Sequence, residues 1–132
     1  MRIFIAALTF ASSALAALPA YAGYGDTITP TQALSNVGLC MTVEGHATLS
    51  PAAGGRNGMQ LTLDDGNGGR LVGYVSAPAS LPDLGSLDGQ TVDVTGVIQM
   101  DYGLPEIELN SQDYVWTAGN APSSLVTCWA SG

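Results

Sequence analysis

The sequence predicts an all-β protein, built as a small barrel of five strands with a short helical connector between the third and fourth strands. Short runs of alternating apolar and polar residues follow one another from residue 37 onward, and this period of two is typical of strands with one buried face. All 17 Gly, and every Pro except Pro19, come after residue 22 and separate these runs. Closing five strands into a barrel also removes exposed strand edges.

The N-terminal segment has the pattern of a secretory signal peptide. Arg2 supplies the charged start, residues 3–18 the apolar stretch, and residues 20–22 a small-x-small cleavage site. Removing residues 1–22 from the 132 leaves 110, which suits one domain. We therefore expect a periplasmic or secreted monomer, cut after Ala22, with no lipid anchor and no membrane insertion.

The predicted organisation has four parts. These are a signal peptide (1–22), a lead-in (23–36) with one helical turn near residues 31–36, a barrel (37–117) and a C-terminal tail (118–132). Cys40 and Cys128 are the two cysteines. An even count in an exported chain favours a disulfide, which would tie the tail to the first strand.

The first strand is expected at residues 37–50, with Gly45 marking a bulge or bend. A hairpin follows, its strands at residues 59–63 and 70–77 and its turn at residues 64–69. Leu61 and Leu63 share one face of the second strand with Met59, and Leu71, Gly73 and Val75 point inward from the third.

The connector at residues 78–89 carries Leu81, Leu84 and Leu87, whose spacing of three predicts a short helical or 3₁₀ plug. The fourth strand is expected at residues 90–102 and the fifth at 106–109, with 114–117 extending or following it. The order β-β-β-α-β-β is that of an OB fold.

Four runs resemble a known family in their order and spacing: Val43-Glu44-Gly45, Leu61-Thr62-Leu63-Asp64-Asp65-Gly66, residues 87–97 and residues 103–109. The chain from Val37 to Leu109 is similar to the single OB-fold modules of bacterial exported and nucleic-acid-binding proteins. The resemblance implies a binding module rather than an enzyme. Single-stranded nucleic acid, oligosaccharide and protein are among the ligands of that family.

Charge argues against a nucleic-acid ligand. The chain has no Lys, and its formal net charge is −8, whereas binding to phosphates needs clustered cations. The leading prediction is an exported, non-catalytic module of the cell envelope or periplasm that binds a protein or a small ligand. The alternatives are a single-stranded nucleic-acid binder and a metal-dependent phosphodiesterase.

OB barrels bind ligands on the face of the second and third strands and on the loops beside it. Candidate ligand-binding residues are Arg56, Gln60, Thr62, Arg70, Tyr74 and Tyr102, beside Asn57, Val72 and Leu104. In one interpretation the tyrosines stack on bases and the arginines hold phosphates. In the other, the tyrosines are half-buried strand residues, and the arginines pair with Asp64, Asp65 or other surface acids.

No catalytic residue, cofactor or metal site is predicted. His46 is the single His, and no GxSxG, P-loop, HExxH or GxGxxG motif occurs. Residues 64–69 only partly resemble a calcium loop, because the alternating acidic phase and the distal Glu are missing. Asp101, Glu106 and Glu108, around the last hairpin, are expected to form a solvated acidic rim.

Overall fold

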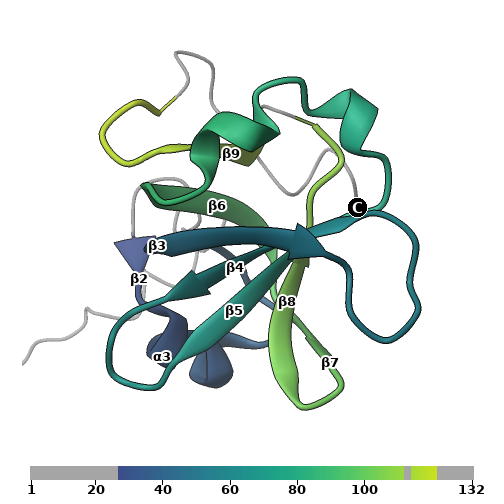
Figure 1. Ribbon diagram of the computed structural model, residues 1–132. Helices are drawn as coiled ribbons and strands as arrows, with labels where there is room; N and C mark the ends of the chain where they lie inside the picture. The colour runs from purple at the N-terminus through teal and green to yellow at the C-terminus, as the bar shows by residue number, and fades with distance from the viewer. Residues whose placement is uncertain (1–26, 112–113, 122–132) are drawn as a thin grey trace, which may run out of the picture.

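The structure is a computed structural model that describes residues 27–111 and 114–121. The described part is mostly strands with one short α-helix, as an all-β protein requires. Eight strands form one sheet, in the pairing order β7-β8-β5-β4-β3-β6-β9, with β2 added beside β3 (Figure 1).

The elements follow the predicted order, although the predicted fourth strand is divided in two and a short strand precedes the first. They are β2 (Thr27–Ile28), α3 (Pro30–Ala33), η2 (Leu34–Asn36), β3 (Cys40–Pro51), β4 (Met59–Asp64), β5 (Arg70–Val75), η3 (Pro78–Ser80), η4 (Leu84–Leu87), β6 (Thr91–Val97), β7 (Gln99–Asp101), β8 (Leu104–Glu108) and β9 (Val115–Thr117).

Strand β3 connects the two parts of the sheet. It pairs with β6 over residues 40–46 and with β4 over residues 46–51, both antiparallel. His46 pairs with both strands, directly after Gly45. A Cβ atom on Gly45 would lie 3.0 Å from the Leu63 Cβ and 3.1 Å from backbone N and O of Asp64. The strands approach this closely because residue 45 has no side chain.

The predicted start of the first strand, residue 37, is wrong. Residues 34–36 form a 3₁₀ turn instead, and Gly38 has φ +90°, which interrupts an extended chain. Val37 and Leu39 are consequently exposed. The strand begins at Cys40 and is half-buried there.

The lead-in contributes to the fold. Thr29 caps α3 through a capping box with Gln32, and Ala33 is fully buried. Strand β2 lies parallel to β3. Residues 1–26, and with them the predicted signal peptide, lie outside the described residues.

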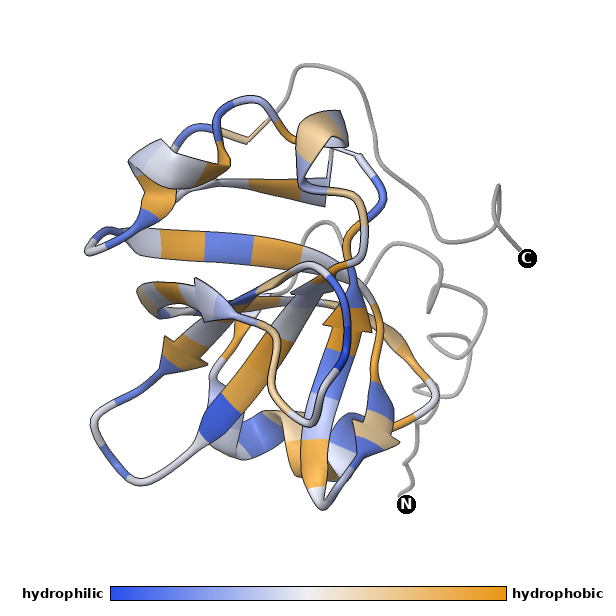
Figure 2. Ribbon diagram, turned by 45° about the vertical axis from the view of Figure 1, so that its right-hand side comes forward, coloured by the Kyte–Doolittle hydropathy of each residue, from blue (hydrophilic) through white to orange (hydrophobic). Residues whose placement is uncertain are grey.

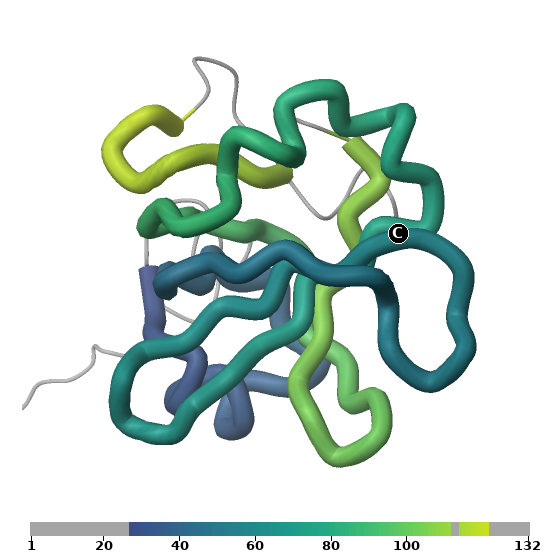
Figure 3. The backbone as a smooth tube through the Cα atoms, in the orientation of Figure 1, coloured from purple at the N-terminus to yellow at the C-terminus, as the bar shows by residue number. Residues whose placement is uncertain are grey.

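The predicted leucine plug is confirmed. Leu81, Leu84 and Leu87 are buried, and the 3₁₀ turns η3 and η4 occupy the predicted connector. Figure 3 shows this segment crossing the top of the view between β5 and β6. It covers the core at that end.

Apolar and polar residues alternate along the strands, as the colouring of Figure 2 shows, and the buried apolar residues form one core cluster. Leu61, Leu63, Leu71 and Val75 are completely buried, as predicted for the hairpin β4–β5. Val72, named above beside the candidate ligand-binding residues, is also buried. Its register partners are Thr62 on β4 and Glu106 on β8.

The predicted fourth strand, residues 90–102, is interrupted. Ile98 separates β6 from β7 because its backbone groups bond to the segment before β3. Its N–H donates to the carbonyl of Leu39, and its carbonyl accepts from the N–H of Gly38. Strand β7 then pairs with β8, which runs parallel to β5. In its hydrogen-bonded order the sheet is open, and β6 and β7 lie near its two ends.

Part of the predicted tail lies outside the described residues. Cys128 belongs to residues 122–132, outside the described residues, so the Cys40–Cys128 disulfide stays a prediction. Residues 115–117 form β9, which pairs with β6 rather than extending β8. In the described ranges, no helix has the length and apolar character needed to cross a membrane.

Asp65 joins the hairpin turn to α3. Its Oδ2 accepts hydrogen bonds from the Thr31 N–H (2.9 Å) and hydroxyl, and its Oδ1 from the N–H groups of Asn67 (2.8 Å) and Gly69 (3.1 Å). The hydroxyl of Thr31, followed by the N–H of Asn67, lowers the pKa of Asp65 to about 2.

We predict that Asp65→Asn removes part of the acid sensitivity of folding. The folded pKa of Asp65 lies below its unfolded value of about 3.9. Its stabilising effect is therefore present above pH 4 and lost as the pH falls through about 2. Urea denaturation from neutral pH to pH 2 measures this. Glu108→Gln removes an exposed carboxylate as the control, and an unchanged pH dependence in Asp65→Asn contradicts the assignment.

We predict that Gly45→Ala destabilises the protein by about 1–3 kcal/mol, because its methyl group meets backbone atoms of β4 that cannot move aside. The matched control is Gly85→Ala, where nothing lies within 4 Å of an added Cβ. Equilibrium unfolding in urea compares the two. Equal stabilities would show that β3 and β4 can separate without cost.

Candidate binding groove

A groove of about 370 Å³ lies beside β5 and β8. The loop at residues 52–58 forms one side, and the hairpin β7–β8 forms the other. Its lining residues are Ala53, Gly54, Arg56, Gln60, Val72, Asp101, Tyr102, Leu104 and Glu106. The groove thus combines apolar, aromatic and charged side chains.

Arg56 holds the two sides of the groove together. Its Nη1 lies 2.7 Å from Glu106 Oε1 and 2.7 Å from Asp101 Oδ2, and its Nη2 lies 3.2 Å from Glu106 Oε2. The paired contact with Glu106 is a bidentate carboxylate–guanidinium pair, a strong type of charged hydrogen bond. The Glu106 side chain is only 8% exposed, so this pair is largely shielded from water.

The aromatic ring of Tyr74 packs against the guanidinium group of Arg56. The Arg56 Cζ lies 3.6 Å from the centre of the Tyr74 ring, which is a cation–π contact. The Tyr74 hydroxyl donates to the carbonyl of Asn57 at 2.6 Å. The ring is therefore fixed between the loop and β5, and it offers no free face on the Arg56 side.

The electrostatics of the groove are set by this cluster. The hydrogen bond to Glu106 raises the pKa of Arg56, with the charges of Glu106 and Asp101 adding to it against the cost of burial. One cation faces two carboxylates, which leaves the cluster with one net negative charge. An incoming phosphate would have to compete with Glu106 and Asp101 for Arg56.

Gln60 and Thr62 occupy the β4 side. Gln60 Oε1 accepts from the N–H of Ala53 at 3.0 Å, and its Nε2 donates to Thr62 Oγ1 at 3.2 Å. The amide orients the beginning of the loop at residues 52–58, so both of these predicted binding residues have a structural role.

Tyr102 is the most exposed large apolar side chain in the described part of the chain, at 84%. It occupies the two-residue turn between β7 and β8, where Tyr102 has φ +51° and Gly103 φ +81°. Positive φ at both positions is the pattern of a type I′ turn, in which Asn-Gly is preferred. A tyrosine there adopts a left-handed conformation that is unfavourable for its side chain.

The predicted site residues fall into two groups. Arg56, Gln60 and Tyr102 line the groove, Tyr74 lies against Arg56, and Thr62 lies beside Gln60. Arg70 is not part of it: it begins β5 opposite Asp64 and lies at the far end of the strand.

The partners of Arg56 were not identified individually from the sequence. Asp101 and Glu106 were expected as a solvated rim, but Glu106 is buried and both carboxylates bind Arg56. The parallel pairing of β8 with β5 places Glu106 opposite Val72, where its carboxylate reaches Arg56 in the loop at residues 52–58. The alternation of Glu106, Ile107 and Glu108 gave no sign of this pairing.

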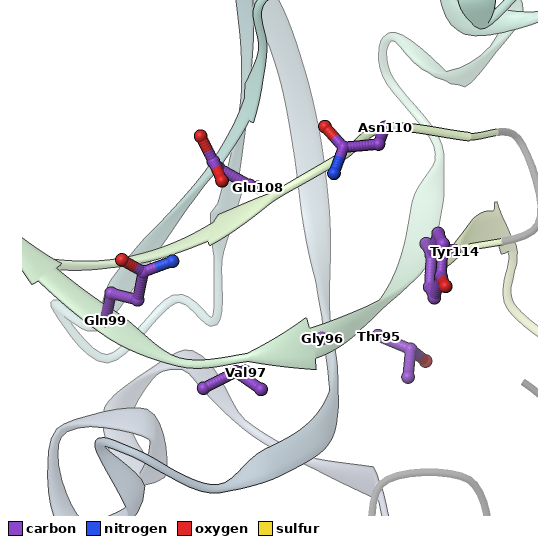
Figure 4. Close-up of a pocket in the computed structure, with 7 residues that line it drawn as sticks. All are labelled: Thr95, Gly96, Val97, Gln99, Glu108, Asn110 and Tyr114. Atoms are coloured by element: carbon purple, nitrogen blue, oxygen red, sulfur yellow. The ribbon is translucent and has the colours of Figure 1, made fainter. Parts of the chain in front are cut away.

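The second cavity, of about 240 Å³, lies where β6 faces β8 without pairing. Its lining residues are Thr95, Gly96, Val97, Gln99, Glu108, Asn110 and Tyr114, which Figure 4 shows. A Cβ atom on Gly96 would lie 2.4 Å from Ile107 Cγ2, so the strands are in contact at its inner end.

Metal binding has no candidate within residues 27–111 and 114–121. No group of three or more His, Cys, Asp or Glu side chains there is arranged to hold an ion. The turn at residues 64–69 uses its carboxylates for its own N–H groups: Asp64 accepts from Gly66, and Asp65 from Asn67 and Gly69.

Comparisons with known proteins assign no family. No family model matches the chain, and no curated protein matches it. Among solved structures it is similar to a putative aspartyl-tRNA synthetase from Leishmania major Friedlin, with 12% identity and a TM-score of 0.48. The match covers 77% of this chain and 23% of the synthetase chain. A likeness of this degree carries no functional inference.

We predict that Tyr102→Asn stabilises the protein, by about 0.5–1 kcal/mol, because Asn tolerates positive φ and few contacts of the exposed ring are lost. The free energy of unfolding in urea measures this. Tyr102→Ala removes the same ring without the preference of Asn for this conformation and serves as the control. A loss of stability in Tyr102→Asn would mean that the ring supports the fold.

Proposed function

We propose that this protein is an exported, non-catalytic binding module of the cell envelope or periplasm, which binds a protein or a small ligand in the Arg56–Tyr102 groove. The chain would form an OB-like barrel, with β3, β4 and β5 as its first three strands. Strands β6 and β7 would be two halves of the fourth, and β8 would be the fifth.

The pairing supports this barrel. Strand β3 pairs with both β4 and β6, and β8 pairs in parallel with β5. Only Ile98 separates β6 from β7, so the chain itself links the strands near the two ends of the sheet. The groove then lies on the face of the second and third strands, where OB barrels bind their ligands.

One observation carries the functional proposal. Tyr102 is 84% exposed and has a positive φ, at the rim of a groove whose single cation is already paired with two carboxylates. A protein keeps an unfavourable backbone conformation when something other than stability depends on it. The exposed ring is the part of the groove that is free to contact a ligand.

The charge of the groove restricts the ligand class. Arg56 is held by Glu106 and Asp101, and the chain as a whole has a net charge of −8. A neutral or cationic ligand meets no repulsion, and the Tyr102 ring suits either a sugar face or a cationic side chain. Single-stranded nucleic acid needs free cations beside its stacking residues, so it is the disfavoured alternative.

A titration of isotope-labelled protein, followed by amide chemical shifts, tests the proposal. The probes are a lysine-rich peptide, a linear glucose oligosaccharide and an oligothymidylate at low salt. We expect the peptide or the sugar to shift the amide signals of Gly54, Tyr102 and Leu104, and Tyr102→Asn to abolish the effect while the protein stays folded.

Two outcomes would overturn the proposal. Saturable binding of oligothymidylate that weakens with added salt would assign the nucleic-acid alternative. No shift at the groove with any probe at millimolar concentration would remove the groove as a binding site. Glu108→Gln, which changes charge outside the groove, controls for unspecific electrostatic effects.

A further inference from the structure

Three side chains on neighbouring strands are in register on the sheet, away from the groove. Glu44 on β3 lies opposite Asp93 on β6, and Asp93 lies opposite Trp116 on β9. Directly opposed residues in an antiparallel pair have their side chains on the same face, within contact distance. The row therefore links the longest strand of the sheet to the last described one.

Asp93 is buried, at 8% exposure, and only half of its carboxyl group has a donor. The Trp116 Nε1–H donates to Oδ2 at 3.1 Å. Oδ1 is buried and receives no hydrogen bond from the described residues. An ionised carboxylate can only accept, and its neighbour Glu44 is an acceptor too when ionised. A proton on one of the two carboxyl groups supplies the missing donor.

Among the described neighbours, none donates a hydrogen bond to Oδ1 of Asp93. On β3, His46 is two residues beyond Glu44 and lies opposite Thr91. On β6, Thr91 and Thr95 flank Asp93, and the Thr95 hydroxyl is already bonded to that of Thr42 at 2.7 Å. On β9, Val115 and Thr117 flank Trp116 and carry no charge. The two arginines among the described residues lie elsewhere, Arg56 in the groove and Arg70 on β5.

Burial is the main cause that raises the pKa of Asp93 to about 7, followed by the facing carboxyl group of Glu44, while the Trp116 hydrogen bond acts in the opposite direction. Two carboxyl groups that share a site lose their protons one after the other, because the second charge is repelled by the first.

We propose that Asp93 and Glu44 share one proton, and that this proton holds β9 on β6 as a pH-sensitive latch. With the proton in place, Asp93 bridges β3 and β9 through Glu44 and Trp116. Its loss leaves two facing carboxylates, one of them buried, and weakens the attachment of β9.

The contribution of Asp93 to folding stability changes with pH in the opposite direction to that of Asp65. The pKa of Asp93 is higher in the folded than in the unfolded chain, so its contribution to stability is complete below pH 4 and declines as the pH rises through about 7. Between pH 5 and pH 7, the unfolding equilibrium constant should rise roughly fiftyfold relative to that of Asp93→Asn.

Trp116 fluorescence tests the latch in the full chain. Trp129→Phe removes the second tryptophan, so emission reports on Trp116 alone. We expect a single transition near pH 7, absent in Asp93→Asn and moved to lower pH in Glu44→Gln. His46→Gln tests for interference from histidine, which ordinarily titrates in this range, and Glu108→Gln is the control for an exposed carboxylate. Both should leave the midpoint unchanged.

The pH-dependent ¹³C shift of the Asp93 carboxyl carbon provides a measurement that does not depend on the Asp93→Asn variant being folded. Titration of this carbon near pH 7 supports the proposal. Titration near the ordinary aspartate value of about 4 overturns it. A fluorescence transition that persists in Asp93→Asn, or a midpoint that Glu44→Gln does not move, overturns it as well.

Discussion

The fold depends on one constraint: β3 must serve two partners in succession. Its first half pairs with β6 and its second half with β4, and the residue that pairs with both, His46, comes directly after Gly45. A side chain at residue 45 would push Leu63 and the backbone of Asp64 away. The core leucines of β4, the plug and the groove all take their positions from this crossing.

The groove shows how a strongly acidic chain uses a rare cation. Arg56 belongs to the loop at residues 52–58 and lies against Tyr74, with two carboxylates around it. Removing one partner of a shielded pair leaves the other charge without compensation, which costs more than the pair contributes. The arginine therefore organises the groove, and Tyr102 is its exposed side chain.

The sequence predicted the parts of the fold that depend on local patterns. Alternation located the hairpin β4–β5, and the spacing of Leu81, Leu84 and Leu87 located the plug. The break at Ile98 was not predicted, because alternation continues through it and the cause is a backbone hydrogen bond to Leu39. Short strands such as β2 and β9 likewise exist through pairing with β3 and β6.

The site was predictable only in outline. The rule that OB barrels bind on the second and third strands identified Arg56, Gln60 and Tyr102, which line the groove. It also included Arg70, which lies at the end of β5 that is far from the groove. The rule selects a face of the sheet but does not say which end of a strand the groove occupies. Glu106 and Asp93 look like ordinary surface acids in the sequence, since their burial is created by strands distant in the chain.

The pairing of β3 with β6 and of β5 with β8 has a consequence for how the chain folds. The hairpin β4–β5 joins neighbouring residues, whereas Cys40 pairs with Val97 and Val72 with Glu106. Long chain loops must close before such contacts form, and proteins dominated by them fold slowly, in milliseconds to seconds. The hairpin β4–β5 should form before the other pairings. Until those pairings form, the outer edge of each of its strands has no partner strand. During that interval the high negative charge of the chain would keep copies apart.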